Sequence, residues 1–332
     1  MSVDSRRHRS HCFILGAGAG WHAKQLLAAA GKLGMSLRFA NYESLRMRIE
    51  NQPLATVSAD ASTSPLASVS NSGATTRMDC TTHAVTRLAM NPGDSVLTRT
   101  MPPGNLEQTT FRLACLHQLV RAGTRVANPP AALEIVIDKN ATLAMAAGLG
   151  IRVPETLSTT SRGEALEAFD SWGGDCVVKP LFGGEGKGVM RIQDRELART
   201  VFATLQTLGS VIHLQRFVYP GGRDQRILII GDHCYAVRRI NANDFRTNRR
   251  FAQNGSTTTQ AVEVDQGLEA RSRSLCDAIG VSVAAVDWID DRDGGVRLIE
   301  VNAIPGWRSA QAVIDDCLAL RMLETTGQRV TT

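Results

Sequence analysis

Two carboxylates and an amide interrupt apolar, strand-like runs near the C-terminal end of the sequence. Glu300 and Asn302 alternate with Ile299 and Val301 in "LIEVN", and Asp287 interrupts the preceding run "AAVDWI". Because side chains alternate faces along a strand, Glu300 and Asn302 should share one face while Ile299 and Val301 anchor the other. Arginines nearby could satisfy the buried carboxylates in salt bridges. The alternative is a hard cation such as Mg²⁺, which accepts one or two carboxylates together with substrate phosphates.

A glycine-rich segment lies upstream of these strands, with one lysine before it and another inside it. The segment is "LFGGEGKG", residues 181–188, and the lysines are Lys179 and Lys187. Glycines allow backbone N–H groups to approach an anion closely, and lysines add charge for phosphate oxygens. A plain β-hairpin with surface lysines has the same pattern. The segment differs from a P-loop because no Gly-Lys-Ser/Thr follows and no helix is expected to begin there.

Arginines are dense between the glycine-rich segment and the two acidic strands: Arg223, Arg226, Arg238, Arg239, Arg246, Arg249 and Arg250. Guanidinium groups bind phosphate and carboxylate in a bidentate way, although such a cluster can also form a solvated basic face. No Ser/His/Asp or Cys/His spacing typical of a protein nucleophile stands out. A phosphate loop, a Mg²⁺ site and an arginine cluster together favour phosphoryl transfer to a carboxylate, which depends mainly on positioning and charge stabilisation.

Composition and charge describe an ordinary globular chain with a mild basic excess. The chain has 332 residues, of which 43% are hydrophobic, and a formal net charge of +5. No stripe of aromatic and basic residues supports nucleic-acid binding, and no apolar run reaches membrane-spanning length. The seven cysteines form no CxxC pair and are expected to be free thiols in a reducing compartment. The polar start lacks a signal-peptide pattern, so we expect a cytoplasmic protein without a nucleic-acid or membrane partner.

The elements that must position these residues begin with alternating strands and helices. Residues 12–15 are predicted to form a buried strand, followed by a glycine turn and a helix over 21–32, and a second strand and helix are predicted within 35–50. Residues 51–77 are rich in Ser, Thr and Ala and are expected to form a mobile insertion. After a domain boundary between 128 and 151, antiparallel strands with accompanying helices are predicted.

The order and spacing of several motifs resemble the ATP-grasp carboxylate–amine ligases of the RimK-like glutamate ligase type. The motifs are "ILGAGAGWHAKQL", "DKNATLAMAAGLGIRVPET", "VVKPLFGGEGKGV", "RDQRILIIGDHCYAVRRI", "DFRTN", "AVDWI" and "EVNAIPGW". The segments "NAIPGWRSAQ" and "SVLTRTMPPGNLEQTTFRL" are most similar to relatives associated with tetrahydromethanopterin.

The resemblance implies a fold of the α/β class, specifically the α+β ATP-grasp arrangement. An N-terminal α/β pre-ATP-grasp domain would cover 1–130 and include the flexible insertion. A subdomain with a glycine-rich lid would cover 131–212, and a C-terminal subdomain with the Mg²⁺ site would cover 213–332. The two subdomains would clasp ATP between them.

The resemblance also implies roles for individual residues, each taken from the position that matches a family motif. ATP would be bound by Lys139, Lys179, Gly183, Gly184, Gly186, Lys187, Gly188, Gln215, Arg216, Phe217, Asp224 and Asn248. Mg²⁺, or Mn²⁺ in its place, would be bound by Asp287, Glu300 and Asn302. Arg226 and Arg246 would be the catalytic residues and would hold the γ-phosphate, an acyl phosphate or an acidic substrate. Two positions depart from the family: Thr247 replaces a serine, and Arg216 stands where an acidic residue is usual.

The implied reaction has two steps. The γ-phosphate of ATP goes to a substrate carboxylate to give an acyl phosphate, and an amino group then displaces phosphate to form an amide. The arginine surplus favours an acidic small-molecule substrate with glutamate as the amino acid, and the resemblance implies a homo-oligomer. The loop over 305–308 is expected to shape the substrate side. Two alternatives remain open: a D-alanine–D-alanine-like or other peptide ligase with the same ATP site, and a non-catalytic ATP-binding scaffold.

Overall fold

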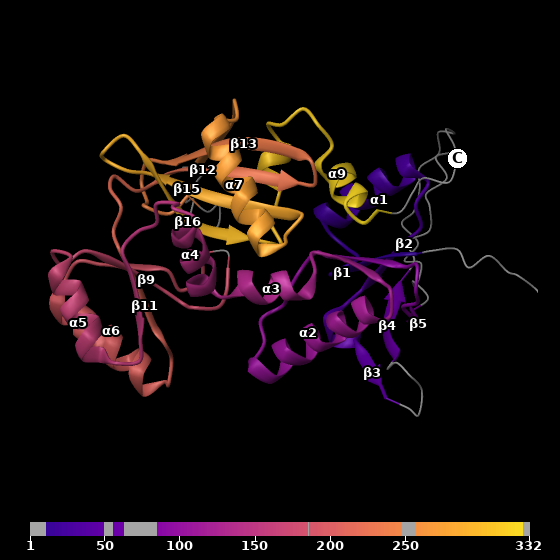
Figure 1. The fold of residues 1–332 in the computed structure, drawn as a ribbon, viewed down its shortest axis with the longest axis horizontal. Helices are drawn as coiled ribbons and strands as arrows, with labels where there is room; N and C mark the ends of the chain where they lie inside the picture. Colours follow the sequence, from indigo (N-terminus) through magenta and orange to yellow (C-terminus); the bar gives the residue numbers. More distant parts are fainter. Residues whose placement is uncertain (1–10, 50–55, 63–84, 185, 248–256, 328–332) are drawn as a thin grey trace, which may run out of the picture. The chain divides into compact units, whose positions relative to one another are not determined.

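The computed structural model describes residues 11–49, 56–62, 85–184, 186–247 and 257–327 (Figure 1). Contacts divide the chain into two compact units. One unit contains the chain up to Pro130 together with the segment from Cys317, and the other runs from Ala131 to Asp316. Every residue with an expected role in binding or catalysis belongs to the second unit.

The first unit is built on a mixed sheet. In spatial order its strands are β3 (Arg46–Arg48), β4 (Thr56–Ser62), β2 (Leu37–Ala40), β1 (Cys12–Leu15), β6 (Ser95–Thr98) and β7 (Arg125–Ala127), and β5 (Val85–Ala89) also pairs with β4. The predicted strand β1 is confirmed: it pairs in parallel with β2 and β6 and is fully buried, which explains its unbroken apolar sequence. The unit also contains the helices α1 (Trp21–Leu33), α2 (Leu106–Arg121) and α9 (Leu318–Glu324).

Two sequence predictions for the first unit are wrong. In the described part of 35–50, a 3-10 turn, η1 (Tyr42–Ser44), takes the place of the predicted helix and links β2 to β3. Within the expected mobile insertion, residues 56–62 form β4, which pairs with β2, β3 and β5. Val57, Ala59 and Ala61 alternate along β4 and are buried, so small apolar side chains at a period of two suffice to pack this strand. The rest of that insertion lies outside the described residues.

Helix α9 belongs to the first unit. It packs against α1, and Nη1 of Arg125 donates a hydrogen bond to the carbonyl oxygen of Thr326 just beyond it (3.4 Å). By these contacts the chain from Cys317 onward belongs to the N-terminal unit, although it lies in the range 213–332 that the resemblance assigns to the C-terminal subdomain. Leu318, Ala319, Met322 and Leu323 of this short helix are buried, and their local sequence does not show which partner covers them.

The second unit contains two sheets. The first is antiparallel and has, in spatial order, β10 (Met190–Ile192), β9 (Cys176–Lys179), β11 (Ile212–Arg216) and β8 (Thr156–Thr159). One face of β9 and β11 packs through Val178 and Leu214 into a core shared with α5 (Arg162–Ser171) and α6 (Arg195–Thr207). Alternation along the same strands turns Lys179 and Gln215 to the opposite face.

The second sheet carries the acidic residues. Its antiparallel strands are, in spatial order, β14 (Thr257–Val262), β13 (His233–Asn241), β12 (Arg223–Ile230), β15 (Val283–Asp290) and β16 (Val296–Asn302). Helix α7 (Gln266–Ile279) packs against β12, and α4 (Lys139–Gly148) packs against β16 and α7. The short helices α3 (Pro130–Ile137) and α8 (Arg308–Gln311) lie at the two ends of the unit in sequence. Short connections join β12 to β13 at 231–232 and β15 to β16, and the antiparallel pairing predicted for this region is confirmed.

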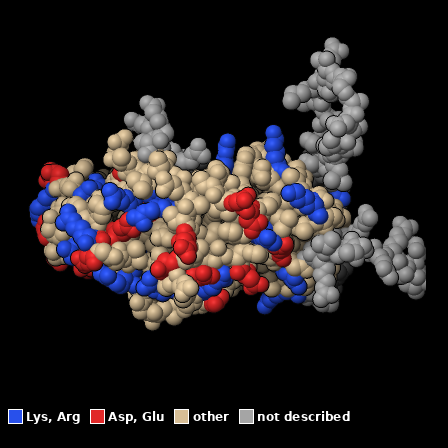
Figure 2. Space-filling view, turned by 90° about the horizontal axis from the view of Figure 1, so that it is seen from above, with Lys and Arg blue, Asp and Glu red and all other residues tan. Residues whose placement is uncertain are grey.

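The described residues include free cysteines and a surface of mixed charge. In the described ranges, no helix is both long enough and apolar enough to cross a bilayer. The described cysteines are free thiols, and most of them are buried. On the face shown in Figure 2, basic and acidic side chains lie interspersed.

Candidate active site

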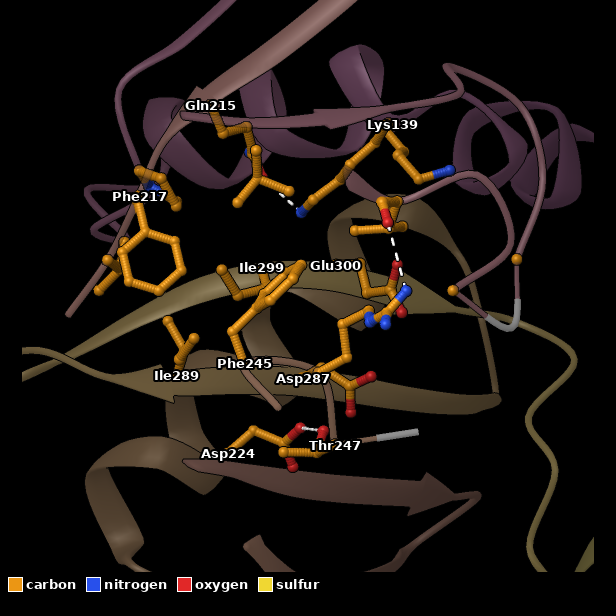
Figure 3. A pocket seen from close by; sticks show the side chains of 18 of the residues that line it. Lys139, Gln215, Phe217, Asp224, Phe245, Thr247, Asp287, Ile289, Ile299 and Glu300 are labelled. Atoms are coloured by element: carbon orange, nitrogen blue, oxygen red, sulfur yellow. Dashed lines mark hydrogen bonds between the residues drawn. The ribbon is translucent and has the colours of Figure 1, made fainter. Parts of the chain in front are cut away.

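A pocket in the second unit gathers most of the residues with an expected role (Figure 3). Those that line it are Lys139, Lys179, Gly183, Gly184, Gly186, Lys187, Gln215, Arg216, Phe217, Asp224, Arg246, Asp287 and Glu300. They come from both sheets, from the start of α4 and from the glycine-rich segment. Gly188, Arg226 and Asn302 are described but do not line the pocket, and Asn248 lies outside the described residues.

Lys139 joins helix α4 to the glycine-rich segment. The helix begins at this residue because the carboxylate of Asp138 caps it, accepting a hydrogen bond from the backbone N–H of Asn140 (2.8 Å). The Nζ of Lys139 donates to the carbonyl oxygen of Gly183 (2.8 Å). The cap therefore places a lysine against the backbone of the segment that was expected to cover phosphates.

Lys179 stands at the end of β9 beside the first lysine. Its Nζ donates a hydrogen bond to Oε1 of Gln215, whose Nε2 donates to Oγ1 of Thr156 (3.0 Å). Burial lowers the pKa of Lys179 to about 8; the charge of Glu300 opposes this shift and the charge of Lys139 adds to it. Burial likewise lowers the pKa of Lys139. Two cations in a partly desolvated site gain stability when an anion binds beside them.

The two carboxylates are direct partners across β15 and β16, with Asp287 opposite Glu300. The register shifts immediately after Asp287, which leaves Ile299 as the extra residue of a β-bulge. Because of the bulge, the neighbours Ile299 and Glu300 both line the pocket. The expectation that Ile299 anchors the opposite face is therefore wrong, whereas Val301 is buried as expected.

Arginines hold Asp287 on its other side. Nε and Nη2 of Arg226 each lie 2.7 Å from one carboxylate oxygen of Asp287, and Nη2 of Arg239 lies 3.2 Å from Oδ1. Arg239 also forms a bidentate pair with Asp224 (2.6 and 2.7 Å), and Asp224 accepts a hydrogen bond from the hydroxyl of Thr247. Burial alone would raise the pKa of Asp287, but the charges of Arg226 and Arg239 outweigh it and keep that pKa well below its usual range.

The expected metal ligands Asp287, Glu300 and Asn302 offer side-chain oxygen atoms, which are the ligands that a hard cation prefers. Asp287 and Glu300 supply two adjacent carboxylates, and Mg²⁺ commonly combines such a pair with substrate phosphates. The amide of Asn302, at the end of β16, has its Oδ1 bonded to the backbone N–H of Ile304 (3.0 Å). Across the described part of the chain, no group of three or more His, Cys, Asp and Glu side chains could hold a metal. A cation would therefore depend on the two carboxylates, the amide and its own substrate ligands.

The other side of the pocket is an apolar slot that the sequence analysis largely missed. Phe217, Phe245, Ile289 and Ile299 lie together in Figure 3, while Lys139 lies on the far side of the pocket. Of these four, only Phe217 was expected to bind a ligand. A usable signal existed for Ile289, because it is two positions after Asp287 and shares its strand face. A slot of this kind accommodates a flat apolar group, with the charged groups beyond it.

Two further arginines singled out by the sequence form ion pairs, and Trp307 is buried. Arg246 forms a bidentate pair with Asp244, with Nε–Oδ1 and Nη2–Oδ2 distances of 3.1 and 2.7 Å. Arg216 pairs with Glu155 at 3.2 Å, and more than half of each side chain is exposed (53% and 54%). Trp307 is 0% exposed, so in the loop after β16 it packs into the interior of the protein.

Several named proteins are similar in sequence to this chain. A profile of the RimK-like ATP-grasp domain matches residues 136–325. A tetrahydromethanopterin:alpha-L-glutamate ligase from Methanosarcina acetivorans is 27% identical over 241 residues, which cover 64% of this chain and 73% of the relative. A probable alpha-L-glutamate ligase from Sodalis glossinidius is 32% identical over 219 residues, which cover 65% of this chain and 72% of the relative.

Solved structures with the same fold confirm the expected class. The ATP-grasp ligase PsnB, complexed with its minimal precursor, matches with a TM-score of 0.68 at 18% identity and covers 95% of this chain and 99% of its own. A RimK domain ATP-grasp protein from Sphaerobacter thermophilus matches with a TM-score of 0.65 at 18% identity and covers 95% of this chain and 98% of its own. Because the domain profile spans more than half of the sequence, the chain belongs to the RimK-like ATP-grasp family and is an ATP-dependent ligase.

Proposed function

We propose that this protein is an ATP- and Mg²⁺-dependent carboxylate–amine ligase that forms an amide through an acyl phosphate. The observation that carries the proposal is a pocket with an apolar slot on one side and Lys139 on the other, whose lining also includes Lys179 and the two opposed carboxylates. ATP has the same division, since a flat base is joined to a polyanion that binds a divalent cation. A solved PsnB structure with Mg and ADP supports the same pairing of nucleotide and metal.

The pocket suggests how the nucleotide would lie. The base would enter the slot between Phe217, Phe245 and Ile289, next to the main chain of 215–217. The phosphates would lie against the two lysines and the glycine-rich segment, where backbone N–H groups can approach them. Asp224 would contact the ribose only by sharing oxygens that Arg239 and Thr247 already bind.

Asp287, Glu300 and Asn302 would hold Mg²⁺, which would neutralise charge on the β- and γ-phosphate oxygens. Arg226 does not line the pocket but pairs with Asp287, so its guanidinium would bind the transferred phosphoryl group only when that carboxylate gains the cation as a partner. Arg246 is the second candidate for this task or for an acidic substrate, because it lines the pocket. Both residues would act by binding and orienting charge.

The proposed reaction balances without a protein nucleophile. A carboxylate oxygen of the acceptor attacks the γ-phosphorus, and the bond from that phosphorus to the bridging oxygen breaks to release ADP. The nitrogen of the amine then attacks the acyl carbon, loses a proton, and phosphate leaves. Glutamate is the proposed amine because relatives at 27–32% identity are named glutamate ligases. An acidic small molecule, a cofactor of the tetrahydromethanopterin kind or a protein carboxylate would be the acceptor.

An ADP-release screen tests this function. Glutamate and other amino acids are each paired with candidate carboxylates, including pterin cofactors, and a D-alanine pair represents the alternative ligase. For any active pair, an acceptor labelled with ¹⁸O in its carboxylate should transfer one label to phosphate per turnover. Production of AMP and pyrophosphate would instead indicate an acyl adenylate and overturn the proposal. Tight ATP binding without ADP release from any pair would favour the non-catalytic scaffold.

A further inference from the structure

The ring of Phe217, which forms one wall of the slot, is enclosed by other side chains. The guanidinium carbon of Arg191 lies 3.5 Å from its centroid, a close cation–π contact. Tyr219 and Phe245 meet it edge-on, with centroid distances of 4.8 and 6.0 Å. A Cβ added to Gly221 would lie 2.6 Å from Cζ of Phe217, so this glycine allows the chain to pass close to the ring. The ring is 6% exposed and lines the pocket.

Asp175 holds Arg191 in this position. Nε of Arg191 lies 2.9 Å from Oδ1 of Asp175, and Nη2 lies 2.6 Å from Oδ2. The hydroxyl of Tyr219 also donates to Oδ2, and the backbone N–H of Phe217 donates to the carbonyl oxygen of Asp175 (3.1 Å). One aspartate therefore organises a guanidinium, a phenol and the backbone of the slot residue.

This carboxylate stays charged in the folded protein. Burial alone would raise the pKa of Asp175, but the hydrogen bonds from Arg191 and Tyr219 outweigh it and the pKa falls below its usual value. A charged, bidentate pair fixes the plane of the guanidinium far better than a single hydrogen bond can. The flat group can then lie against an aromatic face.

None of Asp175, Arg191 and Tyr219 lines the pocket. Their contacts with Phe217 and with the backbone around it are therefore what links them to the wall of the slot. Arg191 is in β10, the strand into which the glycine-rich segment returns, so the residue that lies against the ring of Phe217 follows that segment closely in the sequence.

We propose that Arg191 is a positioning residue for the nucleotide base, held by Asp175 flat against Phe217 so that the ring presents a fixed surface to the slot. The inference rests on the proposed binding of ATP in this pocket. It assigns the base and the phosphates to separate sets of residues, so a change at Arg191 should weaken binding of the base and spare binding of the phosphates.

Two ligands separate these effects. Affinities for ADP and for inorganic tripolyphosphate, which lacks the base, are measured by calorimetry in Mg²⁺ for the wild type, Arg191→Met, Arg191→Lys and Asp175→Asn. Arg195→Met is the matched control, because Arg195 forms a bidentate pair with Asp170 on the exposed side of α6, outside the pocket. We expect Arg191→Met to raise the dissociation constant for ADP about tenfold and to change that for tripolyphosphate by less than about twofold. Asp175→Asn should weaken ADP binding less than Arg191→Met does. Arg191→Lys should also lose less affinity for ADP than Arg191→Met.

Other results would overturn the inference. Unchanged ADP affinity in Arg191→Met, or equal weakening of ADP and tripolyphosphate, would show that Arg191 does not position the base. If Arg191→Met fails to fold, Arg191→Lys and Asp175→Asn give the same comparison. A wild type that binds neither ligand would refute the proposed function itself. If the wild type binds both ligands and the variants bind them with the same affinities, only the role of Arg191 is refuted.

Discussion

Arg226 holds both carboxylate oxygens of Asp287, with Nε–Oδ1 and Nη2–Oδ2 distances of 2.7 Å each. Both side chains are buried, and Arg239 adds a third contact at 3.2 Å. Removing one partner of a buried ion pair leaves an uncompensated charge, which costs far more than an exposed pair is worth. Asp287 therefore contributes to folding as well as to the proposed metal site, whereas Glu300 opposite it is only half-buried.

Asp287→Asn and Glu300→Gln should differ in stability but not in activity. Each removes one proposed metal ligand, so ATP turnover should fall at least ~100-fold in both. Asp287→Asn should also lower the free energy of unfolding by about 3 kcal/mol, because Arg226 loses its charged partner, whereas Glu300→Gln should change it by less than about 1 kcal/mol. Urea unfolding and ADP release, measured on the same preparations, check both statements.

Asp170→Asn is the matched control for these two changes, because Asp170 pairs with Arg195 at an exposed position. It should leave stability and turnover close to those of the wild type. Wild-type turnover in a folded Glu300→Gln protein would show that the metal assignment is wrong.

Binding of ADP should weaken above pH 8. The ammonium form of Lys179 attracts phosphate, and its pKa of about 8 in the folded protein means that this form is lost as the pH rises further. The dissociation constant should then increase by up to about tenfold per pH unit between pH 8 and 9.5. Lys179→Met, which is similar in length and has no charge, should bind more weakly at pH 7 and show a flatter pH profile. A wild-type profile as flat as that of the variant would contradict the assignment.

The same pKa shift of Lys179 should make the folded protein more stable as the pH rises, although it weakens ADP binding. The pKa of Lys179 is about 8 in the folded state and 10.5 ordinarily, so between these values the unfolded chain binds more protons. The free energy of unfolding contributed by this residue should therefore rise with pH across that window. The difference in stability between the wild type and Lys179→Met, measured by urea unfolding from pH 7 to 10, should follow this trend.

Phe245→Ala should raise the KM for ATP about tenfold while kcat changes less than about threefold, because the ring contributes apolar contact to the slot and lies across the pocket from Lys139. Steady-state kinetics at saturating acceptor and amine check this. Phe111→Ala is the control, since Phe111 is partly exposed on α2 in the other unit. If kcat fell as much as kcat/KM in Phe245→Ala, the ring would be acting on the chemical step instead.

Trp307→Ala should destabilise the protein by about 3–5 kcal/mol, because the side chain is fully buried and its loss leaves a cavity. Trp307→Phe should cost less and keep the KM values for ATP and acceptor, which a residue in contact with substrate would not do. Arg308→Ala, at the exposed neighbouring position, should change the free energy of unfolding by no more than about 0.5 kcal/mol. Urea unfolding gives the stabilities and steady-state kinetics gives the KM values.

The sequence by itself was sufficient to find the strands that carry Asp287 and Glu300 and the hairpin that carries the glycine-rich segment. It was sufficient because alternation along a strand and the demands of a turn are set by neighbouring residues. The motif order along the chain was sufficient for the family, since that order is a property of the sequence alone.

Tertiary structure decided which of these residues share a surface. The bulge beside Asp287 turns Ile299 into the pocket. The sequence of one strand does not by itself determine its register with the neighbouring strand. Arg226 and Arg239 look alike in sequence, yet pairing between β12, β13 and β15 places both on Asp287. The side chains of Phe217 and Arg191 meet only because two distant segments pack together. Contacts between strands and buried ion pairs depend on long-range packing, which local patterns do not encode.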